Sequence, residues 1–202
     1  MYSKLPNLII GFHGCDRSTF ELVLHEGNPM ISSNNSYDWL GNGIYFWENN
    51  YQRALLWAEE NAKRKDSKIK IPSVIGAVID MGHCLNLTDN KSIDIVKNGH
   101  ALLKFNSETL GIELPENKNI NGNTDLLLRH LDCAVIERIH AYNKEINNKP
   151  YDSVRGVFVE GGEIYPTAGF REKTHIQICI VNPNCIKGYF NPLSPNEKHD
   201  MP

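Results

Sequence analysis

The sequence lacks the features that mark secreted, membrane-embedded and strongly charged proteins. Its five cysteines are odd in number and form no Cys-x-x-Cys pair, which argues against a disulfide framework and favours a reducing compartment. No apolar run approaches membrane-spanning length, and no long apolar segment follows the N-terminus. The net charge of −3 gives no global case for nucleic-acid binding. We therefore expect a cytoplasmic protein with no membrane partner.

Several familiar catalytic patterns are also missing. There is no phosphate-loop lysine motif and no Gly-x-Ser-x-Gly elbow, and Gly41-x-Gly43 lacks the third glycine of a dinucleotide-binding turn. The eight histidines and five cysteines do not fall at metal-ligand spacing. We expect no metal.

The sequence that is present is typical of one globular domain. It has 202 residues, of which 41% are hydrophobic and 22% charged, enough for a substantial core. We predict a single domain over residues 1–192 with a loose C-terminal tail over 193–202. Short strands surround helices that cluster in the middle of the chain, which favours the α+β class over a doubly wound parallel sheet.

The first part of the chain has clear element signals. Alternation predicts a strand over Leu8–His13, and Gly11 beside His13 suggests open space for a ligand. A helix capped by Asp16 follows. The Gly41-Asn42-Gly43 turn leads into a strand at Ile44-Tyr45-Phe46, and Asn49 or Asn50 caps the next helix.

The middle and the end of the chain are predicted from periodicity. We expect a strand over residues 73–80, a helix over 93–105 and a polar loop over 114–123. Asn123 or Thr124 should open the longest helix, whose apolar stripe extends to Ile146. A last strand is expected over 186–190. The basic run over 63–70 fits either a solvated helix end or a weak nucleic-acid patch.

Residues 156–181 form the segment around which the chain is built. Ile176, Ile178 and Ile180 alternate with His175, Gln177, Cys179 and Val181, which predicts a strand with one core face and one polar face toward a cleft. A long loop over 160–173 precedes this strand, and its length favours a functional role.

Three separated motifs together resemble a known family. They are Gly11-Phe12-His13-Gly14, the block Leu40-Gly41-Asn42-Gly43-Ile44-Tyr45-Phe46 with the segment 53–58 after it, and the strand that contains Gln177. In order and spacing the sequence is similar to the His-Tyr-Glu branch of the ADP-ribosyltransferase superfamily, which includes diphtheria toxin and the poly-ADP-ribose polymerases. The resemblance covers less than half of the chain. It implies a split core of two small, mainly antiparallel sheets flanked by helices.

The resemblance also implies site residues and a substrate, NAD. His13 would bond a ribose hydroxyl of the adenosine half, the main chain of Gly14 would pair with the nicotinamide carboxamide, and Tyr45 would stack on the nicotinamide ring. His13, Tyr45 and Gln177 are the implied catalytic residues. The implied cofactor-binding set is His13, Gly14, Gly43, Tyr45, Phe46, Ala54 and Trp57. Singly, His13 and Tyr45 are as well explained by structural roles; only the joint occurrence favours a site.

The sequence departs from the family at the third position, where Gln177 stands in place of the usual glutamate. A glutamine can orient a group by hydrogen bonds but cannot accept a proton. Three alternatives follow: the acceptor is already a good nucleophile, a loop carboxylate is the base, or the protein is inactive. The loop is also where this family recognises its acceptor, and the loop candidates are Glu160, Glu163, Arg171 and Glu172.

The expected function is single transfer of ADP-ribose from NAD to a macromolecular acceptor, protein or nucleic acid. The resemblance to transferase toxins of toxin–antitoxin and antiphage systems implies an antitoxin partner. The rival hypotheses are an inactive NAD or ADP-ribose sensor, an RNA 2′-phosphotransferase, and an NAD glycohydrolase.

Overall fold

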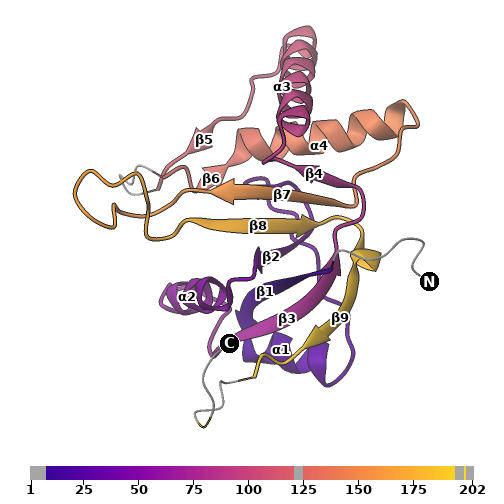
Figure 1. Cartoon of the computed structure of the whole chain (residues 1–202). Coiled ribbons are helices and arrows are strands. Elements are labelled where there is room, and N and C mark those ends of the chain that lie inside the picture. Colours follow the sequence, from indigo (N-terminus) through magenta and orange to yellow (C-terminus); the bar gives the residue numbers. More distant parts are fainter. Residues whose placement is uncertain (1–7, 121–124, 194–197, 199–202) are drawn as a thin grey trace.

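The computed structural model describes residues 8–120, 125–193 and 198, and it has the α+β architecture expected from the sequence. Four α-helices flank a seven-stranded sheet of order β4-β7-β8-β2-β1-β3-β9, beside a two-stranded sheet of β5 and β6 (Figure 1). In the described part of the chain the strands pair antiparallel, except β4 and β7, which pair in parallel.

The elements in chain order are β1 (Leu8–Asp16), α1 (Arg17–Leu24), β2 (Ile44–Glu48), α2 (Tyr51–Ala62), β3 (Pro72–Asp80), β4 (Cys84–Asn86), α3 (Asn90–Leu110), β5 (Asn117–Lys118), β6 (Leu128–Arg129), α4 (His130–Glu145), β7 (Ser153–Phe158), β8 (His175–Ile180), a 3₁₀ turn (Pro183–Cys185) and β9 (Ile186–Phe190).

The sheet is continuous, which differs from the expected division into two small sheets. Its two halves meet at β1 and β2, and there the described pairing covers only Gly11 with Glu48 and Phe12 with Trp47. By comparison, β1 pairs with β3 along nine residues, from Leu8 to Asp16. Beyond Phe12, β1 and β2 are no longer paired, and we call this gap between the two strands the seam.

The helical prediction in the middle of the chain needs correction. Residues 123 and 124, the expected start of the longest helix, lie outside the described residues, and residues 125–129 are not helical. Helix α4 begins at His130 and has 16 residues, whereas α3 has 21. The apolar stripe predicted for this helix began at Leu128, but Leu128 lies in strand β6. An apolar residue fits the pattern of a strand as well as that of a helix, so the sequence placed the helix start too early.

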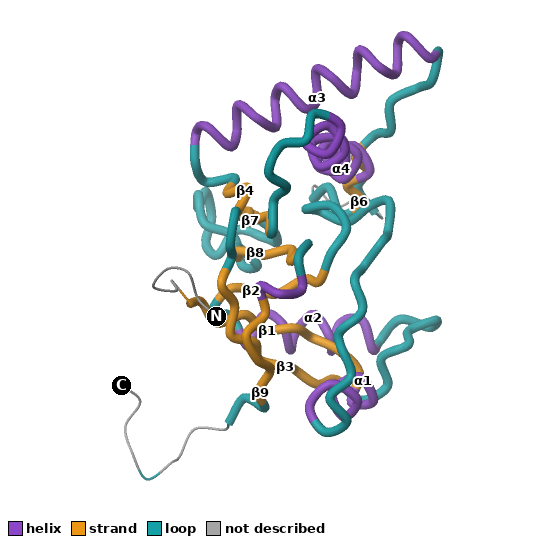
Figure 2. Tube along the Cα trace, turned by 90° about the vertical axis from the view of Figure 1, so that its right-hand side faces the viewer, coloured by secondary structure: helices purple, strands orange, loops and turns teal. Residues whose placement is uncertain are grey.

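Helices α1 and α2 cover opposite faces of the sheet. Phe46 packs with Phe20 and Val23 of α1 in the first core cluster, whereas its neighbour Trp47 packs with Ala54 of α2 in a small third cluster. Successive residues of a strand point to opposite faces. Tyr45 therefore shares the face of Trp47, and it packs against the second cluster, to which α4 contributes Val135, Ile136 and Ile139. Helices α2 and α4 consequently lie on one face and α1 on the other, as the two perpendicular views allow the reader to follow (Figures 1 and 2).

The predicted open space beside Gly11 is absent. A Cβ at this position would lie 2.7 Å from Cδ1 of Ile79 and 2.8 Å from Cβ of Phe46. Glycine is needed here because β1 is packed closely, and not because a ligand approaches.

The N-cap predicted at Asp16 is confirmed, and its carboxylate also ties two distant segments together. It accepts hydrogen bonds from the Ser18 amide (2.9 Å) and hydroxyl (2.7 Å), and from the amides of Lys70 (2.6 Å) and Ile71 (2.9 Å). These bonds, led by that of Ile71, hold the pKa of Asp16 well below its usual range.

We expect Asp16→Ala to lower the free energy of unfolding by about 2 kcal/mol, because a cap and two charge-assisted bonds outside the helix are lost together. The folded-state pKa is depressed, so this stability is present above the unfolded value of about 3.9 and is lost as the pH falls through the folded-state pKa. Urea unfolding at pH 7 and at pH 3 measures both effects. Asp66→Asn, at an exposed turn, is the control. If Asp16→Ala lowers the free energy of unfolding equally at both pH values, the ionised Asp16 carboxylate is not the source of this stability.

No helix within the described ranges is both long and apolar enough to span a bilayer.

Candidate functional site

The seam between β1 and β2 is occupied by the imidazole of His13. Its Nδ1 lies 2.7 Å from the main-chain oxygen of Tyr45, and its ring meets the Phe46 ring edge-on at 5.9 Å between centroids. A carbonyl only accepts, so Nδ1 carries the proton and Nε2 is left as an acceptor. Burial lowers the pKa of His13, which favours this neutral form. The first two predicted motifs are thus joined by one hydrogen bond.

The main chain of Gly14 faces the same seam. The amide of Asn49 donates to the Ile10 carbonyl (2.9 Å), so the polar groups of Ile10 are directed toward β2. In an antiparallel strand the groups of every second residue point the same way, which directs those of Phe12 and Gly14 toward β2 as well. Among the described pairs, β2 extends its pairing to Phe12 and no further. The Gly14 amide and carbonyl therefore border the seam, as recognition of a carboxamide would require.

Tyr45 and Gln177 lie on one face of neighbouring strands. Tyr45 pairs with Cys179 and Trp47 with Gln177, so Tyr45 and Gln177 are diagonal neighbours. The phenol hydroxyl donates to the Gly41 carbonyl (2.6 Å) and accepts from the Leu40 amide (2.8 Å). Gln177 is half-buried. The structure therefore brings Tyr45 and Gln177 together on one face, whereas the His13 ring lies in the seam against the main chain of Tyr45.

A buried ionic network borders this face. Nη2 of Arg53 on α2 lies 3.5 Å from Oε2 of Glu160, and Nδ1 of His175 lies 3.4 Å from the same oxygen. The three residues are 9%, 5% and 4% exposed. Nδ1 of His175 lies closer, at 2.6 Å, to the Lys173 carbonyl, so Nδ1 carries the proton.

The network holds one ion pair and one neutral histidine. Burial lowers the pKa of His175 to about 4, and the positive charges of Arg53 and Arg129 act in the same direction. Its contact with Glu160 is therefore not an ion pair at neutral pH. Burial raises the pKa of Glu160, Arg53 opposes the rise, and Asp125 adds to it. A raised pKa makes the Glu160 carboxylate a stronger proton acceptor than an ordinary glutamate.

Several buried polar atoms around this network lack hydrogen-bond partners among the described residues. They are Nε1 of Trp47, Nε and Nη1 of Arg53, and Nε2 of His175. The Arg53 guanidinium lies 5.8 Å from the Trp47 ring, and the Trp47 and His175 rings are 6.3 Å apart. Buried polar groups are ordinarily hydrogen-bonded, so this cluster of unpaired ones is an unusual feature of the core beside Trp47 and His175.

The remaining residues of the predicted cofactor set mostly pack the core. A Cβ at Gly14 would collide with the Ala54 carbonyl, and one at Gly43 would lie 2.5 Å from Sγ of Cys179. Ala54 and Phe46 are each 0% exposed, so their side chains serve packing. Trp57 is half-buried against Trp47, with ring centroids 5.6 Å apart. Of these residues, Gly14 through its main chain and Trp57 through its ring border the site.

The loop between β7 and β8 divides into a buried base and an exposed tip. Glu160 belongs to the network, and the loop is held there because Lys173 bonds Glu60 of α2 (2.7 Å) and the Gly161 amide donates to Asp125 (2.9 Å). At the tip, Arg171 pairs with Glu163 at 3.5 Å between exposed side chains. Glu172 is exposed. Thus Glu160 is separated from the other three predicted loop residues.

Both faces of β8 are largely buried, contrary to the expected wet face. His175 and Cys179 are 4% and 0% exposed, because α2, α4 and the loop cover the polar side of the strand. Residues two apart in a strand share a face, so the sequence could have indicated that His175 lies beside Gln177 and Trp47 beside Tyr45. No sequence signal indicates that Arg53 is buried.

No thiol at the site is activated, since burial raises the pKa of Cys15 to about 12 and also raises that of Cys179. Within the described ranges no group of three or more His, Cys, Asp or Glu side chains is arranged to hold a metal ion.

Comparison with known proteins finds similarity without an assigned activity. The uncharacterized protein MJ0359 of Methanocaldococcus jannaschii is 29% identical over 201 residues, which cover 87% of this chain and 83% of that protein. No family model matches the chain. No solved structure matches it either. These comparisons do not show an ADP-ribosyltransferase relationship.

Proposed function

We propose that the protein is an NAD-dependent mono-ADP-ribosyltransferase that moves ADP-ribose to a macromolecular acceptor and releases nicotinamide. The observation that carries the proposal is the bond from His13 Nδ1 to the Tyr45 carbonyl, because it joins two motifs 32 residues apart. It presents Nε2 as an acceptor for a ribose hydroxyl, beside the main-chain groups of Gly14 that match a carboxamide. Tyr45, Trp47 and Gln177 supply the adjoining face.

The chemistry requires a bond to break at the ribose carbon that carries nicotinamide. The electron pair leaves with nicotinamide, and positive charge develops on the ribose as in other glycosyl transfers. The Gln177 carbonyl can accept a hydrogen bond from a ribose hydroxyl and hold the sugar in place. It carries no negative charge to oppose the developing positive charge, so the transition state gains less than a glutamate would supply.

In the proposal, Glu160 serves as the proton acceptor for the attacking group. Glu160 lies two positions after Phe158, the last residue of β7, so it continues the face that carries Phe158 and His175. Burial raises its pKa, and Arg53 holds its carboxylate. In this proposal Gln177 positions the ribose and Glu160 receives the acceptor proton. Polymer formation is not part of the proposal, because it requires a ribose hydroxyl to be activated beside residue 177.

Nicotinamide release from NAD tests the activity directly. The purified protein is incubated with NAD alone, and then with labelled NAD in cell lysate, and the label is treated with protease or nuclease. Macromolecular label that one of these treatments removes supports transfer and identifies the acceptor class. Nicotinamide release with no macromolecular label would instead assign an NAD glycohydrolase. Absence of both would contradict catalysis.

We expect Gln177→Glu to raise NAD hydrolysis about tenfold, because a carboxylate at this position adds charge stabilisation on the order of 1.4 kcal/mol to the transition state. The fold should persist, since Gln177 is itself only half-buried, unlike His175 and Cys179 on the same face. Initial rates of nicotinamide release measure the effect, with Gln52→Glu on the exposed face of α2 as control. If Gln177→Glu is inert while Glu160→Gln abolishes transfer, residue 177 is not the third position of the site.

An NAD or ADP-ribose sensor is the second candidate. The observation that favours it is Gln177 itself, whose side chain has no titratable group to take part in turnover. Saturable NAD binding with no nicotinamide release would support the sensor. An RNA 2′-phosphotransferase of the same superfamily is less well supported, because that branch has a second histidine where Tyr45 stands. A neutralising antitoxin and a cytoplasmic location belong to the proposal for the transferase only.

A further inference from the structure

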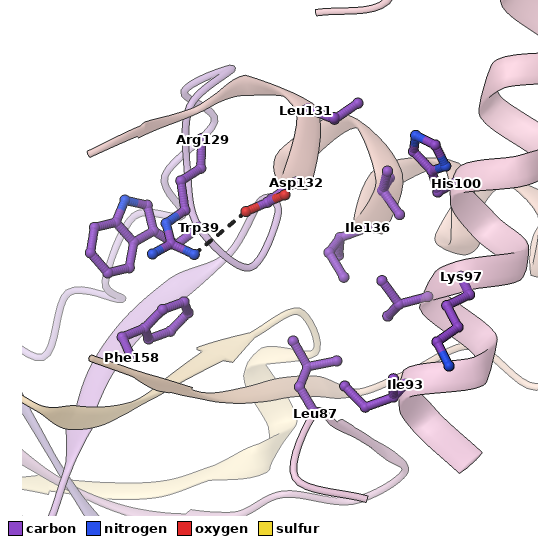
Figure 3. A pocket seen from close by; sticks show the side chains of 12 residues that line it. Trp39, Leu87, Ile93, Lys97, His100, Arg129, Leu131, Asp132, Ile136 and Phe158 are labelled. Carbon is purple, nitrogen blue, oxygen red and sulfur yellow. Dashed lines mark hydrogen bonds and ion pairs between the residues drawn. The ribbon is translucent and has the colours of Figure 1, made fainter. Parts of the chain in front are cut away.

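A cavity lies away from the seam, between helices α3 and α4 and the edge of the sheet (Figure 3). Its volume is about 460 Å³. This is within the range of roughly 300–1,000 Å³ that is common for small-molecule sites. Its apolar walls come from α3, α4 and the segment after β4, and they are formed by Leu87, Ile93, Val96, Leu131, Val135 and Ile136.

One wall of the cavity is aromatic and holds a cation. The Arg129 guanidinium lies 4.1 Å from the Trp39 ring centroid and 4.8 Å from that of Phe158. Its Nε donates to the Leu126 carbonyl (3.0 Å), and Nη1 lies 3.5 Å from Asp132. Among the described residues no hydrogen bond of Nη2 is found. The guanidinium is therefore fixed in position, and Nη2 keeps unused donor capacity.

Two cations, Arg129 and Lys97, and one carboxylate, that of Asp132, line the cavity. The carboxylates of Glu160 and Asp125 do not line it, but they also act on the charge of Arg129. The Asp132 carboxylate is engaged on both oxygens, by Asn117 Nδ2 at 2.8 Å and by Arg129. Lys97 is exposed at the mouth and pairs with Asp94 (3.1 Å). A ligand carboxylate would meet a guanidinium in apolar surroundings, where a charge-assisted bond is strong.

We propose that this cavity binds a small aromatic carboxylate. The ring would lie among the aliphatic side chains and against Trp39 and Phe158, and the carboxylate would meet Arg129. His13, Tyr45 and Gln177 do not line this cavity, but it adjoins the Glu160–His175 network, because the Trp39 and Phe158 rings both contact the His175 ring. The binding proposal does not require the transferase activity.

The matched probes 1-naphthaleneacetate and 1-naphthaleneacetamide test the proposal, because they share one ring system and differ in charge. The indole signals of a ¹⁵N-labelled sample are followed during each titration. The chain has three tryptophans, and the Trp39 Nε1 donates to the Leu127 carbonyl (3.0 Å), so its signal reports on the aromatic wall. We expect a saturable shift of the Trp39 signal, no shift of the Trp57 signal, and at least about fivefold tighter binding of the carboxylate than of the amide.

Two variants and one control make the outcome decisive. Arg129→Gln should remove the preference for the carboxylate, and Val96→Phe should weaken both probes by filling the cavity. Arg138→Gln, on α4 and paired with Glu145 at 2.6 Å outside the cavity, should behave as wild type. Equal affinity of the two probes for the wild-type protein, a Trp39 signal that does not shift, or a preference that survives Arg129→Gln would overturn the proposal.

Discussion

A His13→Ala variant is expected to lose on the order of 10- to 100-fold in kcat/KM for nicotinamide release, the effect of removing the partner of a buried polar group. The imidazole supplies Nε2 to the proposed ribose hydroxyl, and its Nδ1 bond fixes that orientation. Because the adenosine ribose is remote from the bond that breaks, the loss should be larger in 1/KM than in kcat. Steady-state kinetics over a wide NAD range separates the two terms.

His13→Asn separates the functional role of His13 from a structural one. An asparagine amide can replace Nδ1 as the donor to the Tyr45 carbonyl (2.7 Å in the wild type) but has no atom in the place of Nε2. This variant should keep the thermal stability of the wild-type protein and still show the rise in KM. His25→Ala, with a side chain that is 63% exposed, is the control. If His13→Asn restores full activity, the imidazole is structural and the proposed NAD contact is wrong.

Glu160→Ala is expected to lower the free energy of unfolding by about 3 kcal/mol. The substitution leaves the Arg53 guanidinium buried without its counter-charge, and the Arg53 side chain is only 10% exposed. Two of its nitrogens, Nε and Nη1, already lack partners among the described residues, so little is available to replace the lost contact. Chemical denaturation measured in parallel for wild type and variant gives the difference.

The two ends of the same loop provide the comparison. Glu163 pairs with Arg171 at the exposed tip, and Glu163→Ala should lower the free energy of unfolding by no more than about 0.5 kcal/mol. A double variant, Arg53→Met with Glu160→Leu, should recover much of the stability, because an apolar pair avoids the desolvation of two charges. If Glu160→Ala and Glu163→Ala lower the free energy of unfolding equally, the buried Arg53–Glu160 pair contributes no more to stability than an exposed pair.

Local sequence pattern was enough to predict the strands and caps of the first half. The cap at Asp16, the turn before β2 and the cap at Asn50 were each indicated by residue types with one strong local preference, and all three are present. The alternation of Ile176, Ile178 and Ile180 likewise placed β8 and the direction of Gln177. These features depend on neighbours in the chain, so they can be inferred without the fold.

The start of α4 and the environment of Gly11 were predicted incorrectly, for a shared reason. An apolar residue such as Leu128 suits a helix or a strand, and a glycine in a strand suits a ligand or a close neighbour. Which alternative applies depends on the segment that packs against it, and for Gly11 that segment includes Ile79 on β3.

Only the tertiary structure shows how the site is assembled. The seam exists because β1 pairs with β3 along its whole length and leaves β2 after Phe12, which lets the His13 ring take the Tyr45 carbonyl. The buried contacts of Arg53 with Glu160 and of Arg129 with Trp39 join residues far apart in the chain. Short-range pattern reports which face of an element is apolar, whereas the burial of a charge is set by the partners that the folded chain brings to it.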